Sequence, residues 1–352
     1  MKKVISGIQQ IGIGTCDTKE AFKWYRTHFG MDIRIFEEHA EANLMRDYTG
    51  GKARQRHAIL ALNMLGGGGF EIWQFTAREP AGSKFKIQLG DYGIFAAKIK
   101  CRDIETTYDL LRSRDVQVIS DIKTSPAGNR HFFAKDPFGN IFNFIGFNNW
   151  FKKSGGLIGG VAGCIIGISD AEKAMRFYGR ILGYDQVISD ETSVFTDLRS
   201  IPGGDQPMRR ILLRHSMPRL GGFSKFFGPS EIELIQVKER KAKSIYDDRY
   251  WGDPGFIHLC FDVSGMSAIE KECRELGFQF TVDSANSFDM GDAAGRFSYV
   301  EDPDGTLIEF VETHKVPIIK KLGWYMNLAR RNPEKALPNW MVRSLSFNRV
   351  RK

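Results

Sequence analysis

Residues with reactive side chains occupy every second position of one apolar segment, residues 257–263, as His258, Cys260 and Asp262. Alternate residues of a β-strand project from the same face, so an imidazole, a thiol and a carboxylate would share one face while the intervening apolar residues face a core. These groups could hold a transition metal, or the thiol could act as a nucleophile. Small residues commonly fill such strand positions, so the pattern favours packing for Cys260.

Spacing excludes two other kinds of reactive site. The five cysteines are an odd number and include no C-x-x-C pair, which argues against a disulfide framework or a structural zinc site and for a reducing compartment. No Lys-Ser/Thr follows the run Gly66–Gly69, so it is not a phosphate-binding loop. That run and residues 220–229 could form mobile lids over an apolar substrate, or simply long hairpins.

The elements that position these residues recur along the chain. Residues 7–31 combine an alternating strand, an Asp and a helical pattern with a Trp-Tyr pair, and residues 160–184 repeat this order with a Phe-Tyr pair. An Asp-Pro-x-Gly turn followed by a strand occurs at residues 136–145 and again at 302–311. The repeat predicts two homologous halves that meet near residues 152–156.

Each half divides once more. The strand, Asp and helix pattern of the first half reappears at residues 95–111, and that of the second half reappears from residue 257. Four βαβββ modules therefore account for the chain up to about residue 312, which predicts an α+β fold.

This arrangement resembles the vicinal-oxygen-chelate superfamily, which contains glyoxalase I, bleomycin-resistance proteins, methylmalonyl-CoA epimerase, extradiol dioxygenases and 4-hydroxyphenylpyruvate dioxygenase. The resemblance covers about residues 5–312. It implies four modules paired into two cup-shaped antiparallel sheet domains, residues 1–150 and 157–313, followed by a basic helical tail, residues 314–352. It leaves the reaction open, because this fold hosts many reactions.

In that family a metal is held by residues of the first and last strands of each module. The resemblance implies that Glu233, His258 and Glu309 form a metal site in the second-half cup. Two carboxylates beside one imidazole suit Fe(II), Mn(II), Ni(II) or Zn(II), and either Glu could leave the metal and act as the catalytic base. Gly163 occupies a position where members of that family often have a fourth metal ligand, so the implied ligand set has only three residues.

The first half offers Gln10, Glu71, Ala96 and Asn143 at the corresponding positions. Strand alternation would place Lys98 near Glu71, where an ion pair replaces a metal. We therefore predict that the first-half cup is metal-free.

The second-half cup is predicted to be lined by six further residues: Gly163, Ile165, Cys260, Asp262, Phe226 and Phe227. The implied function is that of a metal-dependent enzyme, dioxygenase-like or an isomerase or lyase, acting on a small molecule that chelates through neighbouring oxygens. The alternative is a non-catalytic small-molecule binding protein of the bleomycin-resistance type, which the vacant first half favours.

The net charge of +8 is concentrated in the tail. Residues 315–352 hold ten basic residues and one acidic residue, so residues 1–314 are nearly neutral and nucleic acid is not the expected partner. Five tail residues mark one helical face: Ile318, Leu322, Tyr325, Met326 and Ala329. This tail is predicted to pack against the body, with peripheral contact to an anionic membrane or another partner as alternatives.

The expected location is cytoplasmic, with the membrane surface as the peripheral alternative. The sequence shows neither a signal peptide nor a continuous apolar run of about 18 residues. Because four modules in one chain already provide two cups, either a monomer or a homodimer is compatible with the sequence.

Overall fold

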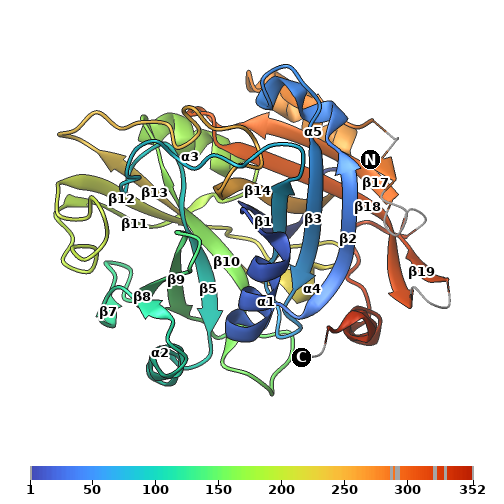
Figure 1. Cartoon of the computed structure of the whole chain (residues 1–352), viewed down its shortest axis with the longest axis horizontal. Helices are drawn as coiled ribbons and strands as arrows, with labels where there is room; N and C mark the ends of the chain where they lie inside the picture. The colour runs from blue at the N-terminus through green and yellow to red at the C-terminus, as the bar shows by residue number, and fades with distance from the viewer. Residues whose placement is uncertain (1, 286–287, 290–293, 320–322, 329–330, 351–352) are drawn as a thin grey trace.

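The computed structural model of the chain describes residues 2–285, 288–289, 294–319, 323–328 and 331–350. Two curled β-sheets lie side by side, and helices cover parts of them (Figure 1). The architecture is α+β with four βαβββ modules forming two cups, as the sequence predicts. Among the described residues, no helix is long and apolar enough to cross a membrane.

Sheet A contains ten strands: β1 (Val4–Gly14), β2 (Ile33–Glu41), β3 (Gln55–Leu62), β4 (Gly69–Phe75), β14 (Gly255–Ser264), β15 (Phe280–Asp283), β16 (Phe288–Asp289), β17 (Ala294–Glu301), β18 (Leu307–Ile319) and β19 (Trp324–Asn327). Sheet B contains nine: β5 (Gly93–Cys101), β6 (Gln117–Val118), β7 (Lys123–Thr124), β8 (Arg130–Lys135), β9 (Ile141–Gly146), β10 (Ile158–Gly167), β11 (Gln186–Ser193), β12 (Met208–Arg214) and β13 (Glu231–Val237). Most neighbouring strands are antiparallel, but β1 pairs with β4, β14 with β18, β10 with β13 and β5 with β9 in parallel.

The helices are short. They are α1 (Thr18–Phe29), α2 (Ile104–Ser113), α3 (Ala171–Arg180), α4 (Ser224–Phe227), α5 (Met266–Glu275) and α6 (Asn339–Arg343), with 3₁₀ helices η1 (Asn43–Tyr48) and η3 (Ser344–Asn348).

Each sheet is assembled from both halves of the chain. In sheet A, β1 of the first module pairs antiparallel with β14 of the fourth, and in sheet B, β10 of the third module pairs antiparallel with β5 of the second. The expectation that the two modules of one half close into one cup is therefore wrong. All four opening strands carry a similar alternating pattern, and this pattern determines which face is buried but not which strand lies alongside.

The repeated motifs of one half nevertheless meet behind the sheets. Tyr25 of α1 donates a hydrogen bond to Asp136 in the turn before β9, at 2.6 Å, and Tyr178 of α3 donates to Asp302 in the turn before β18, at 2.8 Å. Both tyrosines are buried in the main apolar core. Each half is thus joined by its helix and turn, while its strands belong to two sheets.

Aspartates begin three of the four module helices, as the repeated strand, Asp and helix pattern indicates. Asp17, Asp103 and Asp170 each accept hydrogen bonds from backbone N–H groups in the first turn of α1, α2 and α3. The fourth module differs, because Gly265 precedes α5 and its backbone N–H donates to the carboxylate of Glu312 at 2.6 Å.

The tail is only partly helical. Ile318 lies in β18, and Tyr325 and Met326 lie in β19, so the predicted helical face is instead part of a β-hairpin. Leu322 and Ala329 lie outside the described residues. The helical part begins at α6, beyond Pro338, and it packs on the body through its buried residues Val342 and Leu345.

Candidate functional site

Four adjacent strands at the centre of sheet A each carry one polar side chain on the same buried face. Glu71 lies on β4, Gln10 on β1, His258 on β14 and Glu309 on β18. All four side chains are buried. The strand order brings together two residues of the first half and two of the second, which the closure of each half on itself would have kept apart.

The four side chains form a compact cluster. The Nε2 of His258 lies 3.3 Å from the Oε2 of Glu71 and 3.1 Å from the Oε2 of Glu309, and the amide of Gln10 donates to Glu71 at 3.1 Å. One ligand atom each from Glu71, His258 and Glu309 lies within 4.8 Å of the others. Such spacing is compatible with three ligands around one metal ion.

Three atoms of the cluster are buried without a hydrogen-bond partner among the described residues. They are the Oε1 of Gln10, the Nε2 of His258 and the Oε2 of Glu309. The last two lie 3.1 Å apart but without hydrogen-bond geometry. Buried polar atoms are normally paired, so an unpaired group of three requires an explanation. Oxygen and imidazole nitrogen are suitable donors for a divalent transition metal, and the residues present therefore fit such an ion.

The charge balance of the cluster is that of a site that attracts cations. Burial alone would lower the pKa of His258, but the carboxylates of Glu309 and Glu71 outweigh burial and raise this pKa to about 9. A metal would have to displace the imidazole proton, so metal uptake would release a proton.

Two neighbours hold the imidazole in place. The Oη of Tyr299 lies 3.3 Å from its Nδ1, which leaves Nε2 directed at the two carboxylates. Gly12 lies on the neighbouring strand β1, and a Cβ added there would stand 2.5 Å from the ring of His258. Glycine at this position therefore makes room for the imidazole rather than for a ligand.

A cavity of about 300 Å³ opens beside the cluster, with both Glu71 and Glu309 in its wall. Large apolar side chains dominate the lining, including Trp73, Phe226, Phe227, Trp251, Tyr299 and Leu345. Phe226 and Phe227 belong to α4, in one of the glycine-rich loops, and Leu345 belongs to the C-terminal tail. The cavity suits a small molecule with a large apolar part.

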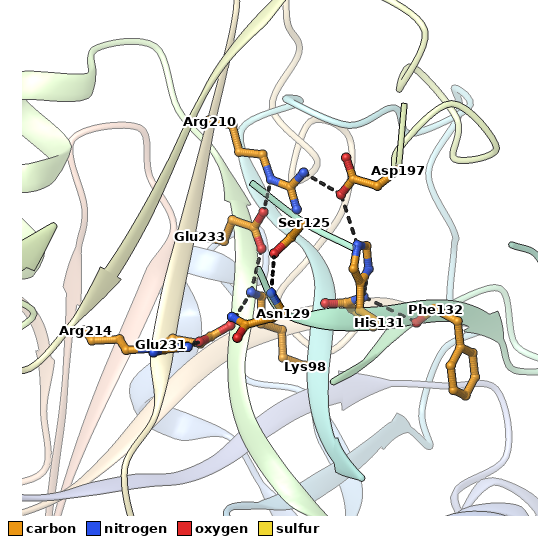
Figure 2. Close-up of polar contacts among 11 residues, drawn as sticks. Lys98, Ser125, Asn129, His131, Phe132, Asp197, Arg210, Arg214, Glu231 and Glu233 are labelled. Carbon is orange, nitrogen blue, oxygen red and sulfur yellow. Dashed lines mark hydrogen bonds and ion pairs between the residues drawn. The ribbon is translucent and has the colours of Figure 1, made fainter. Parts of the chain in front are cut away.

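Glu233 does not belong to this cluster. It lies on β13 in sheet B, where its carboxylate contacts Lys98 at 2.5 Å and also accepts from the Nε of Arg210 (Figure 2). These cations hold the pKa of the carboxyl well below its usual range, despite burial. The expectation that Glu233 lies beside His258 and Glu309 is wrong, because β13 and β14 belong to different sheets.

Lys98 forms ion pairs with buried carboxylates, but not with the predicted partner. Its ammonium contacts Glu231 at 2.6 Å as well as Glu233, whereas the expected partner Glu71 lies in sheet A. Arg210 continues the network to Asp197. Figure 2 shows this chain of opposite charges crossing the cup of sheet B, where the remaining cavity is only about 10 Å³.

His131 ends this chain. It lies 3.0 Å from Asp197 and 3.0 Å from the amide of Asn143, a residue that the sequence placed in a metal-free cup.

The other predicted cup residues are divided between the two sheets. Gly163 and Ile165 lie on β10, and Ile165 is buried in an apolar cluster of sheet B. Cys260 pairs in register with both Gln10 and Glu309, but its thiol is buried and lies 3.7 Å from the Oε1 of Gln9.

Asp262 faces a smaller hollow of about 110 Å³, next to Glu312, rather than the main cavity. Burial and the neighbouring Glu312 raise its pKa to about 7, although a hydrogen bond from Ser6 opposes this effect. The folded chain therefore binds this proton more tightly than the unfolded chain, and wild-type stability falls as the pH rises from about 4 to about 7.

We expect Asp262→Asn to be increasingly more stable than the wild type over that pH interval, by about 1.4 kcal/mol for each pH unit at most. Denaturant unfolding at pH 5 and pH 8 measures the difference. Asp205→Asn, an exposed control, should show no such trend. An advantage of Asp262→Asn that is equal at the two pH values would contradict the assignment.

Sequence positions could have identified all four residues of the cluster. Gln10 and Glu71 occupy the same module positions as Gly163 and Glu233, in the half that the sequence predicts to be metal-free. The missing information was which modules share a sheet.

Comparison with known proteins agrees with this architecture. The family model described as Glyoxalase/Bleomycin resistance protein/Dioxygenase superfamily matches residues 7–144 and 160–310. Glyoxalase I from Zea mays is similar in structure, with a TM-score of 0.55 and 13% identity over 88% of this chain and 92% of that chain. A putative dioxygenase from Bacillus subtilis gives a TM-score of 0.58 and 14% identity over 88% and 86% of the two chains.

A curated relative is matched over a much shorter length. A phosphoglycerate kinase from Rhodospirillum centenum is 30% identical over 104 residues, which cover 27% of this chain and 25% of that protein. The chain thus spans about a quarter of the curated relative that it matches.

Proposed function

The chain belongs to the glyoxalase/bleomycin resistance protein/dioxygenase superfamily, and on this premise we propose that it is a metal-dependent enzyme with its active site in the cup of sheet A. The proposed ligands are Gln10, Glu71, His258 and Glu309. The observation that carries the proposal is the convergence of these four buried side chains from four adjacent strands, with unpaired donor atoms at the centre of the cluster. Fe(II), Mn(II), Ni(II) and Zn(II) all suit this donor set.

The substrate that this site fits is a small molecule with neighbouring oxygens at one end and a large apolar part. A divalent metal bound there would polarise a substrate oxygen as a Lewis acid. The aromatic side chains of Trp73, Trp251 and Phe226 would hold the apolar part and exclude water. Tyr299 would keep the imidazole of His258 oriented during the reaction.

Among the reactions of this fold, we propose proton transfer, as in an isomerase or lyase. The carboxylates of Glu71 and Glu309 lie on the cavity wall, where the Oε2 of either could accept a proton from a carbon next to a substrate carbonyl. The non-haem iron oxygenases use two imidazoles and one carboxylate, whereas this cluster contains one imidazole and two carboxylates.

The test combines two readouts on the full chain loaded with each metal: exchange of substrate carbon-bound hydrogen with deuterated solvent, and consumption of oxygen. Catechols, 2-oxo acids and acyl-CoA esters serve as substrates. We expect metal-dependent exchange without oxygen consumption, and a loss of at least about 100-fold in Glu309→Gln. Glu275→Gln, in an exposed ion pair, is the matched control.

Two results would contradict the proposal. Oxygen consumption dependent on the same residues would indicate a dioxygenase. Stoichiometric binding of a ligand in the cavity without turnover in any metal form would favour the binding-protein alternative.

A further inference from the structure

A basic groove of about 940 Å³ lies between two parts of the chain. One is the linker near residues 152–156 that joins the two halves, and the other is the C-terminal helical segment formed by α6 and η3. Its cations are Lys152 and Lys153 from the linker and Arg343 and Arg349 from the tail. None of the described residues that line this groove is acidic. In Figure 1 the helical segment, in red, lies near the C-terminal end of the chain and close to the green linker loop. Arg349 is ion-paired with Asp32, so Lys152, Lys153 and Arg343 supply the positive charge that the groove presents to solvent.

Two large apolar side chains project into water from the same helical segment. Trp340 is 62% exposed and Phe347, which lines the groove, is 66% exposed. Most large apolar side chains among the described residues are buried, and of the exposed ones only Met217 is more exposed than these two aromatic rings.

The segment that carries these residues is anchored to the body. Val342 and Leu345 are buried on its inner side, and the backbone N–H of Val350 donates to the carbonyl of Asp32 at 2.9 Å. The guanidinium of Arg343 stacks over the ring of Phe151, at 5.9 Å from its centre, which connects the segment to the linker. Cations and exposed aromatic side chains are thus held in a fixed relation rather than on a free tail.

We propose that this surface binds an anionic lipid membrane. Lys152, Lys153 and Arg343 would lie against acidic headgroups, and Trp340 and Phe347 would enter the interfacial layer, where amphipathic and apolar rings are favourable. A free phosphate or a nucleotide would use the cations and leave both exposed rings in water. A lipid interface uses both features, and the inference does not depend on the proposed enzymatic activity.

This surface is also connected to the cavity. Arg343 and Phe347 of the C-terminal helical segment line the basic groove. Leu345 of the same segment lines the cavity beside the four-residue cluster. Membrane binding would place one wall of the cavity at the lipid surface, which suits a substrate with a large apolar part.

The test is sedimentation of the full chain with phosphatidylcholine vesicles, with or without about 30% phosphatidylserine. We expect binding that requires phosphatidylserine and is lost at high salt, because charge attraction at a membrane surface is screened. Lys152→Gln/Lys153→Gln should lower the partition coefficient about 25-fold, since each basic residue near such a surface contributes about five-fold. Trp340→Ser/Phe347→Ser should also lower it at low salt, where the wild type binds.

The matched control is Lys84→Gln/Lys173→Gln, two lysines that are 71% and 72% exposed outside the groove. This control should bind like the wild type. An equal loss in the control, or equal binding to vesicles without phosphatidylserine, would overturn the proposal. Tighter binding to a labelled single-stranded oligonucleotide that displaces the vesicles would also overturn it, because the groove would then be a nucleic-acid site.

Discussion

Replacing Lys98 by methionine is expected to lower the free energy of unfolding by about 3–5 kcal/mol, because the change removes the cation shared by two buried carboxylates and leaves each with a single arginine partner. The ammonium lies 2.6 Å from Glu231 and 2.5 Å from Glu233, and all three side chains are at most 4% exposed. Burial alone would lower the pKa of Lys98, but the two carboxylates outweigh burial and raise it, so the lysine stays charged. Methionine keeps most of the side-chain volume, so the loss would report the charge.

Denaturant unfolding of wild type and variant measures this difference. Lys271→Met provides the matched control, because Lys271 pairs with Glu275 at 3.8 Å on an exposed helix surface and should change the free energy of unfolding by less than about 0.5 kcal/mol. Adding Glu233→Gln to Lys98→Met should recover part of the loss. A decrease below about 1 kcal/mol for Lys98→Met would mean that the network does not stabilise the cup of sheet B.

Both sheets have buried carboxylates in their cups, but the residue beside those carboxylates differs between the two sheets. In sheet B, Lys98 stands beside Asn143 in the strand register, as Cys260 stands beside Glu309 in sheet A. A strand residue thus supplies the positive charge in sheet B. In sheet A the corresponding thiol supplies none, and the cluster around His258 retains unpaired donor atoms.

Much of the fold could be predicted from local sequence. The alternating strands, the helix-starting aspartates and the Asp-Pro-x-Gly turns each act over a few residues, so Asp17 and Asp170 could be recognised as equivalent without a structure. Their repetition was enough to identify four modules. The partner of each opening strand depends on contacts far apart in the sequence, and alternation is the same for either partner.

That one missing fact accounts for the error at the candidate site. Module position identifies the residues, but closure of each half on itself groups Glu233 with His258 and Glu71 with Lys98. Exchanging the two glutamates between cups gives the observed arrangement. Lys98 does lie among buried carboxylates, but its partners are Glu231 and Glu233 rather than Glu71.

The tail shows a different reason for error. Hydrophobic residues at helical spacing within 318–329 indicated a helix, yet β18 continues to Ile319 and pairs with β19. The continuing strand pairing in sheet A outweighed a weak local helical pattern. The predicted packing of the tail against the body agrees with the buried positions of Leu337 and Leu345.

The most direct test of the central claim, that the metal site joins the first and fourth modules, compares metal content in Glu71→Gln and Glu233→Gln. Both substitutions keep the size of the side chain and remove one carboxylate. The full-length proteins, loaded with Mn(II), Ni(II) or Zn(II) and freed of excess metal, would be analysed for metal per chain, with circular dichroism to confirm that each is folded.

We expect one metal per chain in the wild type and in Glu233→Gln, and a loss of metal in Glu71→Gln. Retention in Glu71→Gln with loss in folded Glu233→Gln would contradict it, and would return the site to the second half of the chain.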